Sequence, residues 1–225
     1  MTMRNENKIM EIVVDGLILF GVSTVLVVVA DIGFSRLKGK VPKDDPIVAA
    51  ISQGEIKAVE DAVIAANKSG GTSGITATDE HGRTSLMRAA YANLSNAEGL
   101  AKQEKSRSAV VTLLLDNGAE INAADKDGWT ALMWASWSGM PEVVNTLLAR
   151  GASVGNADRQ GNTALTISAQ RGNPAIVKAL VEKGADLTAK TKTGQTALDI
   201  AKSTMTDYPK KKNDYKDILK TLGGY

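Results

Sequence analysis

The chain has 225 residues, of which 43% are hydrophobic and 23% are charged, and its formal net charge is +2. This composition is that of a folded protein rather than a disordered one, and so small a net charge gives no general attraction to nucleic acid. The absence of cysteine excludes disulfides, thiolate metal sites and a cysteine nucleophile. His81 is the only histidine, which argues against histidine-based catalysis and against a zinc site.

The first apolar segment has the length of a membrane-spanning helix. Residues 16–30, GLILFGVSTVLVVVA, carry no charge, and apolar residues extend the run to residues 12–34. A helix over that range is about 34 Å long at about 1.5 Å per residue, which is enough to cross a bilayer. Asp15 and Asp31 would lie near the two headgroup layers, where charge is least costly. We therefore predict a tail over residues 1–11, one transmembrane helix over 12–34 and a basic linker over 35–44.

A cleavable signal peptide is the alternative interpretation of this segment. Val28-Val29-Ala30 resembles a cleavage site that follows an apolar core. The region before that core, however, carries three acids beside only two basic residues, whereas a signal peptide begins with a basic region. A retained anchor is therefore favoured, and cleavage after Ala30 would instead release an exported periplasmic protein.

The basic residues on either side of the predicted helix indicate its orientation. Arg4 and Lys8 precede it, and four basic residues follow it: Arg36, Lys38, Lys40 and Lys43. Because an excess of Lys and Arg marks the cytoplasmic side, we expect the following domain to face the cytoplasm, as in a bacterial inner membrane. The periplasmic side is the alternative.

Small residues recur along the predicted membrane helix. Gly16, Ser23 and Ala30 are spaced seven residues apart, and such a row allows another membrane helix to approach closely. We expect this face to pack against a second helix. A direct part in ion or proton transfer is the weaker hypothesis, because the single interfacial acid Asp15 is not a relay.

The rest of the chain repeats with a period of 33 residues. The segments DKDGWTALMWAS, DRQGNTALTISA and TKTGQTALDIAK begin at Asp125, Asp158 and Thr191, each 33 residues after the one before. A Gly-Ala pair closes each unit at the same period, at Gly118, Gly151 and Gly184. A fixed period of this size is typical of a solenoid, in which each unit buries its apolar face against its neighbours.

Each recurring position has a physical explanation. The glycine before the threonine permits a tight turn with positive φ, and the threonine hydroxyl can cap the helix that follows. Val144, Leu147 and Leu148 place one apolar face on a second helix. The closing glycine, Gly151 in this unit, can end that helix in a left-handed conformation.

Taken together, these motifs resemble the ankyrin-repeat family. The G-x-T-A-L turn and helix start, the V-x-x-L-L second helix and the closing Gly-Ala recur in register, and the resemblance covers about Asp45 to Leu222. It implies an all-α solenoid of helix–turn–helix units with short hairpin loops. We expect five parts: a capping helix pair over residues 45–78, units over 79–124, 125–157 and 158–190, and a C-terminal capping unit over 191–225.

The unit over residues 79–124 is longer than the others. Gly82 and Gly128 are 46 residues apart, 13 more than the period, so the insertion lies between Ala90 and Val110. Its alanine, glutamate and lysine content predicts lengthened helices rather than a loop. Insertions in solenoids often carry recognition, and an extension without a function is the equal alternative.

All three tryptophans fall in a single unit. The resemblance implies that Trp134 takes a semi-buried place on the inner helix, whereas Trp129 and Trp137 match variable positions that face the concave groove. Met133 and Met140 stand beside them, where the family has polar residues. Because exposed tryptophan is frequent at interface hot spots, we predict a partner-binding patch of Trp129, Met133, Trp137 and Met140. The alternative is that these rings pack on the next unit.

The sequence favours a binding protein over an enzyme. Its glycines stand at repeat boundaries rather than in a phosphate-binding loop, Asp125 and Asp158 recur because they start hairpins, and His81 lies in a turn. We expect no catalytic residue, cofactor, metal site, nucleic acid or small-molecule substrate. We expect an accessory or scaffolding subunit that binds another protein of a membrane complex through its repeats and the lipid bilayer through residues 12–34. The alternative is an exported ankyrin protein that binds a soluble periplasmic enzyme.

The predicted anchor has a direct test. We expect the protein to stay in the membrane pellet after washing with alkaline carbonate or with high salt, because an apolar helix across the bilayer is not held there by charge. The measurement is immunoblotting of pellet and supernatant. Recovery of a soluble form that begins at Asp31 would instead support the exported protein.

Overall fold

The computed structural model describes residues 46–53, 56–68, 73–91, 100–208 and 211–223, and within these ranges every element is a helix. The helices are α2 (Pro46–Gln53), α3 (Ile56–Lys68), α4 (Ser73–Thr76), α5 (Ser85–Ala90), α6 (Leu100–Asp116), α7 (Ala131–Ser138), α8 (Pro141–Ala149), α9 (Ala164–Arg171), α10 (Pro174–Glu182), α11 (Ala197–Asp207) and α12 (Lys212–Thr221). No helix among them is long and apolar enough to span a bilayer. The predicted membrane helix over 12–34, with Gly16, Ser23 and Ala30, lies outside the described residues.

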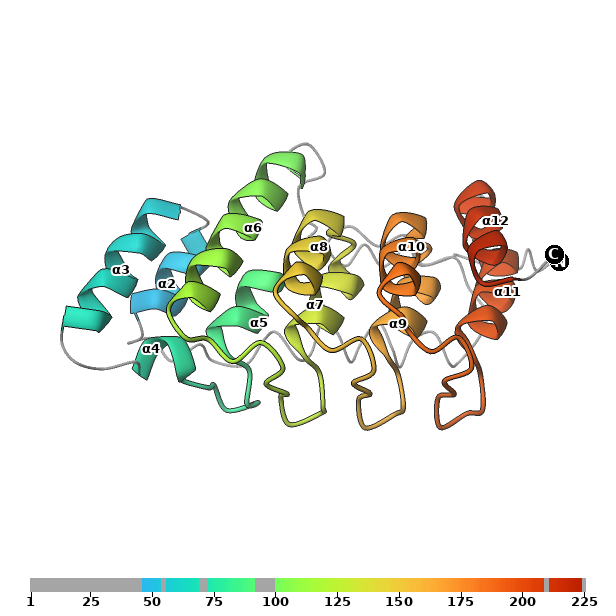
Figure 1. Ribbon diagram of the computed structural model, residues 1–225, viewed down its shortest axis with the longest axis horizontal. Coiled ribbons are helices and arrows are strands. Elements are labelled where there is room, and N and C mark those ends of the chain that lie inside the picture. Colours follow the sequence, from blue (N-terminus) through green and yellow to red (C-terminus); the bar gives the residue numbers. More distant parts are fainter. Residues whose placement is uncertain (1–45, 54–55, 69–72, 92–99, 209–210, 224–225) are drawn as a thin grey trace, which may run out of the picture.

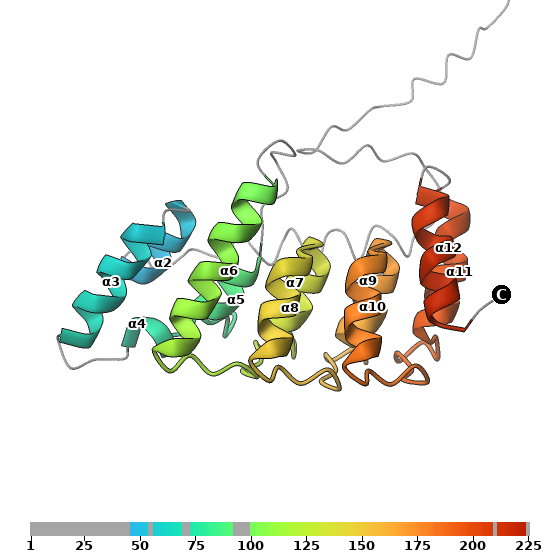
Figure 2. The same ribbon diagram turned by 45° about the horizontal axis from the view of Figure 1, so that its top comes forward.

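The helices stack in pairs along one direction and form two layers (Figure 1). One layer consists of α2, α5, α7, α9 and α11, each in contact with the next, and we call these the inner helices. The other consists of α3, α6, α8, α10 and α12. The loops that join consecutive pairs all lie along one edge of the stack, and the view in Figure 2 shows the same order of pairs. The fold is therefore the solenoid that the 33-residue period predicts.

A threonine begins the inner helix of each unit. The side chain of Thr130 accepts a hydrogen bond from the backbone N–H of Met133, and Thr84, Thr163 and Thr196 cap their helices in the same way. The cap satisfies one of the backbone donors that a helix N-terminus leaves free. The prediction of a capping threonine is thus confirmed in all four places.

Backbone hydrogen bonds join each hairpin to the next. Lys126 N donates to His81 O at 2.9 Å, Arg159 N donates to Asp127 O at 2.9 Å, and the backbone N–H of Lys192 donates to the next carbonyl in the same series, that of Gln160, at 2.8 Å. These bonds fix the separation of adjacent hairpins at the distance of a hydrogen bond. The hairpin edge is therefore a continuous ladder, although its members come from different units.

That ladder explains why glycine occupies the turn. Gly128 has a φ of 88°, a backbone conformation that residues with a Cβ rarely adopt. A Cβ at this position would also lie 3.0 Å from Cα of Asp158 in the next hairpin. The position therefore requires glycine both for its conformation and for the close approach of its neighbour.

The apolar core passes through every unit without a break. Leu132 and Leu165, one period apart on α7 and α9, are each 1% exposed, and Leu147 and Leu180 occupy equivalent positions on the second helices α8 and α10 and are completely buried. Each of these side chains packs in a core that neighbouring units share. No unit could keep its apolar residues dry alone.

The first and last units depart from the repeat. α6 has 17 residues where α8 and α10 each have nine, so the predicted lengthening is found in the second helix of the unit over residues 79–124. The inner helix α5 is not lengthened, because it has six residues where α7 and α9 each have eight. At the other end α12 begins at Lys212. Its Tyr215 lies against the end of α9, where the hydroxyl donates to the carbonyl of Gln170 at 2.9 Å. Burial raises the pKa of Tyr215 to about 12.

Two glycines with the same conformation allow the effect of a positive φ to be measured separately from the effect of a close neighbouring backbone. Gly128 and Gly151 both have a φ of 88°, but a Cβ at Gly151 meets nothing within 4 Å. Gly151→Ala should cost only the left-handed conformation, about 1–2 kcal/mol. We expect Gly128→Ala to lower the free energy of unfolding by about 1 kcal/mol more, because the neighbouring backbone has to shift. Urea denaturation followed by circular dichroism measures both, and equal losses would contradict this account of the hairpin edge.

Candidate protein-binding surface

Four aromatic rings form a continuous row that joins the unit over residues 79–124 to the unit over residues 125–157. Trp134 lies with its ring centroid 5.6 Å from that of Tyr91 and 4.7 Å from that of Trp129, and Trp129 lies 5.9 Å from Trp137. The first and last of these pairs meet edge to face, which is a favourable arrangement for aromatic rings. We call Tyr91, Trp134, Trp129 and Trp137 the aromatic row.

The expectation of an exposed patch was wrong for three of its four residues. Trp129 is 6% exposed, Met133 and Met140 are each 1% exposed, and Trp137 alone is partly exposed. The indole N–H of Trp129 donates a hydrogen bond of 2.9 Å to the carboxylate of Asp158 in the next unit. The turn that precedes Trp129 therefore directs its ring along the stack and not outward. The rings pack on the neighbouring unit, which was the alternative, and contact of these four residues with a partner stays a prediction.

The hairpin aspartates have structural partners. Oδ1 of Asp158 accepts the backbone N–H groups of Gln160 and Asn162, each at 2.8 Å, and Oδ2 accepts the indole N–H of Trp129 and the side-chain amide of Asn162. Asp125 accepts two backbone N–H groups of its own hairpin in the same way. The prediction that these aspartates start hairpins is confirmed. Their oxygens hold the turn and are not arranged as an acid–base pair.

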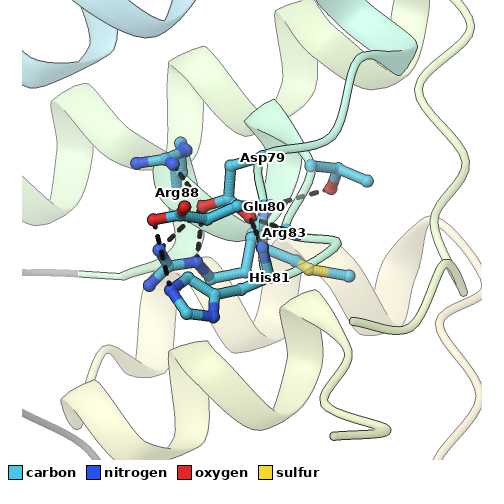
Figure 3. Close-up of polar contacts among 7 residues, drawn as sticks. Asp79, Glu80, His81, Arg83 and Arg88 are labelled. Atoms are coloured by element: carbon cyan, nitrogen blue, oxygen red, sulfur yellow. Dashed lines mark hydrogen bonds and ion pairs between the residues drawn. The ribbon is translucent and has the colours of Figure 1, made fainter. Parts of the chain in front are cut away.

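The corresponding aspartate of the first unit holds two arginines (Figure 3). Oδ2 of Asp79 accepts hydrogen bonds from Nε of Arg83 at 2.7 Å and from Nη2 of Arg88, while Oδ1 accepts the backbone N–H groups of His81 and Arg83, each at 2.9 Å. The side chains of Asp79 and Arg83 are 1% and 3% exposed. We call Asp79, Arg83 and Arg88 the buried ion cluster.

Burial and charge act in opposite directions on Asp79. Burial alone raises its pKa, but the backbone N–H of Arg83 and the guanidinium charges of Arg83 and Arg88 together outweigh burial and hold the pKa below its usual value of 3.8. The carboxylate therefore stays charged at neutral pH and balances one of the two positive charges of Arg83 and Arg88. His81 lies in the same hairpin with its side chain 41% exposed and its Nε2 atom 3.7 Å from Glu80.

A second pair of arginines lies at the C-terminal ends of the inner helices. Arg171, the last residue of α9, donates from Nε to the carbonyl of Trp137 at 3.1 Å, and its guanidinium carbon lies 4.5 Å from the centroid of the Trp137 ring. Arg107 reaches from α6 to the end of α5, where Nη1 donates to the carbonyls of Arg88 and Ala89. Both guanidinium groups are favourably placed at the negative ends of helix dipoles.

Both arginines also lie near the aromatic row. The positive charges of Arg171 and Arg107 both lower the pKa of Tyr91, although burial raises it by more. Burial lowers the pKa of Arg107 and of Arg171. We call Tyr91, Arg107, Trp137 and Arg171 the arginine–aromatic cluster.

Sequence reasoning identified only Trp137 of this cluster. The signal that points to Tyr91 was present: Tyr91 and Trp137 each stand seven positions after a capping threonine, Thr84 and Thr130. Arg107 had no such signal, because the insertion removes it from the 33-residue register.

The described residues show no other concentration of functional side chains. Among them, no group of three or more His, Cys, Asp or Glu residues is arranged to hold a metal ion. The exposed large apolar residues are Ile64, Leu187 and Tyr208, and they lie on three separate elements, α3, the loop after α10 and the end of α11. Single exposed apolar residues of this kind are normal on protein surfaces.

The buried ion cluster predicts a large loss of stability when its acid is removed. We expect Asp79→Asn to lower the free energy of unfolding by about 3 kcal/mol, because it leaves buried arginines without their counter-ion. Asp116→Asn is the matched control, since Asp116 pairs with Arg150 at the surface and is 56% exposed; we expect a change within about 0.5 kcal/mol. Urea denaturation at pH 7 measures both.

The pH dependence gives a second measurement on the same variant. Because the folded-state pKa of Asp79 lies below 3.8, its contribution is present above the unfolded-state pKa and is lost as the pH falls through the folded-state pKa. The stability difference between the native protein and Asp79→Asn should therefore shrink below about pH 4. A difference that stays constant in acid would show that charge on Asp79 does not stabilise the fold.

Comparison with known families agrees with the architecture. A family model described as ankyrin repeats in three copies matches residues 100–158, and one described as ankyrin repeats in many copies matches residues 147–201. No curated protein matches the chain. The two matched ranges overlap and together cover α6 to α10 and the first residues of α11, with the hairpins between them. Ankyrin repeats are thus detected over residues 100–201, and such repeats indicate a protein–protein interaction domain.

Proposed function

We propose that this chain is a non-enzymatic accessory or scaffolding subunit that holds a partner protein on its ankyrin stack and is anchored in a membrane by a helix over residues 12–34. The observation that carries the binding function is the ankyrin stack itself, a row of helix pairs in which each pair contacts the next. Such a scaffold offers an extended surface along several units, and its repeats are protein-interaction modules.

The non-enzymatic part of the proposal is supported by the use that the polar residues already have. Asp79, Asp125 and Asp158, the most buried acids, each hold the backbone of a hairpin or the side chains of neighbouring units. A general base needs a proton-accepting atom within reach of a substrate. Both oxygens of Asp79 and of Asp158, and Oδ1 of Asp125, already accept hydrogen bonds from donors of the protein.

The membrane part of the proposal rests on the sequence. The uncharged run from Gly16 to Ala30 and its apolar flanks have the length of a transmembrane helix, and the basic linker after it favours a cytoplasmic position for the repeats. The row Gly16, Ser23 and Ala30 is proposed to contact another membrane helix. The partner is therefore proposed to belong to a membrane complex.

One experiment separates the two attachments. The full-length protein, tagged at its C-terminus, is extracted from native membranes in a mild detergent, and the proteins that accompany it are identified by mass spectrometry. The matched variant replaces residues 12–34 by an unrelated single-pass helix. We expect the same partner with both proteins, because the repeats hold it. A partner lost with the exchanged helix would place the attachment in the membrane, and recovery of the chain alone would contradict the binding function.

A further inference from the structure

The arginine–aromatic cluster lies where three inner helices end side by side. Tyr91 follows α5 directly, Trp137 is in the last turn of α7 and Arg171 ends α9. Because α5 contacts α7 and α7 contacts α9, these ends are adjacent along the stack, and the bond from Arg171 to the Trp137 carbonyl joins two of them. The residues of the cluster are partly exposed, so a partner can reach them.

The guanidinium groups of Arg107 and Arg171 have N–H donors that form no hydrogen bond with the described residues. Arginine carries five N–H donors, and Arg171 gives only its Nε to a described residue while Arg107 gives only Nη1. The fully buried polar atoms that lack a partner do not include the other guanidinium nitrogens of Arg107 and Arg171. Within the described ranges, the remaining N–H groups therefore point to solvent or to a ligand.

No acid of the described residues balances this charge. The groups that act electrostatically on Arg171 are the phenols of Tyr208, Tyr215 and Tyr91, and the one that acts on Arg107 is Tyr91. Phenols are neutral at neutral pH. The ion pairs of the described residues include Arg83, Arg88 and Arg150 but neither Arg107 nor Arg171. Two partly desolvated positive charges thus lie beside two aromatic rings without a counter-ion from these parts of the chain.

We propose that Arg107 and Arg171, flanked by Tyr91 and Trp137, bind a carboxylate group of an acidic segment of the partner protein. A guanidinium group presents parallel N–H donors that match the two oxygens of a carboxylate. Arginine, tryptophan and tyrosine are also the residues that dominate the energetics of protein interfaces. This inference rests on the proposed function and adds the place and the chemistry of the contact.

A protein ligand is favoured over a nucleic acid by the charge of the molecule. Nucleic-acid binding needs many basic groups along a phosphate backbone, whereas the net charge here is +2 and the cluster contains two arginines. The nearby amino group of Lys211 already donates to the carbonyl of Arg171 at 3.2 Å. Two arginines beside Tyr91 and Trp137 suit a short acidic segment rather than an extended phosphate backbone.

The test uses the full-length protein in detergent and a defined probe. Random twelve-residue peptides displayed on phage are selected on the immobilised protein, and the strongest binder is synthesised with a fluorescent label. A second peptide carries Gln and Asn in place of Glu and Asp. We expect the selected peptides to share an acidic residue, and the amidated peptide to bind at least about tenfold more weakly, since a charge-assisted bond is lost.

Variants of the protein assign the contact. Arg171→Gln and Arg107→Gln should each weaken binding of the acidic peptide about tenfold and leave the amidated peptide unaffected. Arg171→Lys keeps the charge but not the fork, and we expect an intermediate loss. Arg150→Gln is the matched control, because Arg150 is a surface arginine paired with Asp116, and we expect less than a twofold change. Circular dichroism melts of each variant establish that it is folded.

The outcomes distinguish this inference from the proposed function. Peptides that bind without an acidic preference, or acidic peptides whose affinity is the same in Arg171→Gln and Arg107→Gln, overturn the carboxylate site and leave the binding function standing. Displacement of the acidic peptide by a single-stranded oligonucleotide of equal charge, at a lower concentration than by the unlabelled peptide, overturns the choice of a protein ligand. A stack that selects no peptide and recovers no partner from membranes overturns both.

Discussion

Every unit of this stack has an apolar face that it cannot cover alone, so the distance between neighbouring units governs everything else. On the helical side that distance is set by side chains such as Leu132 and Leu165, which tolerate small adjustments. On the hairpin side it is set by backbone hydrogen bonds of about 2.9 Å between successive turns, which tolerate much less. The hairpin ladder is thus the stricter of the two constraints. It explains why glycine, aspartate and threonine recur with the period of the fold while the residues between them vary.

The fixed distance between adjacent hairpins also determines how Trp129 packs. A residue directly after the turn glycine stands where two hairpins are closest, and a large ring there has room only along the stack. Trp129 therefore packs between units and uses its indole N–H on Asp158, the residue that starts the next hairpin. The contact couples a core residue of one unit to the turn of its neighbour. This contact therefore supports cooperative folding of the two adjacent units, as expected of a quasi-one-dimensional core.

The period made the architecture predictable because caps, turns and helix ends depend on residues close together in the sequence. Thr130 caps α7 and the positive φ of Gly128 makes its turn, and both depend on residues within one unit. The direction of the Trp129 ring was not predictable, because it depends on Asp158 one unit away, and a tryptophan near a groove resembles an interface residue until its neighbour is placed. The contact of Tyr215 with the carbonyl of Gln170 was not predictable either, because the two residues are 45 positions apart. Arg107 lies beyond the insertion, where the register gives no guidance.

The two arginine pairs of the chain show how differently a solenoid can treat buried charge. Arg83 and Arg88 meet Asp79, whose side chain is 1% exposed, and this carboxylate balances one of their two charges inside the protein. Arg107 and Arg171 instead bond to carbonyls at helix ends, which offset only part of a full charge. The first arrangement gives the arginines a counter-ion within the protein, which reduces the cost of their desolvation. The second arrangement keeps donors open beside Tyr91 and Trp137 at the ends of adjacent helices, and an incoming carboxylate would complete it as Asp79 completes the first.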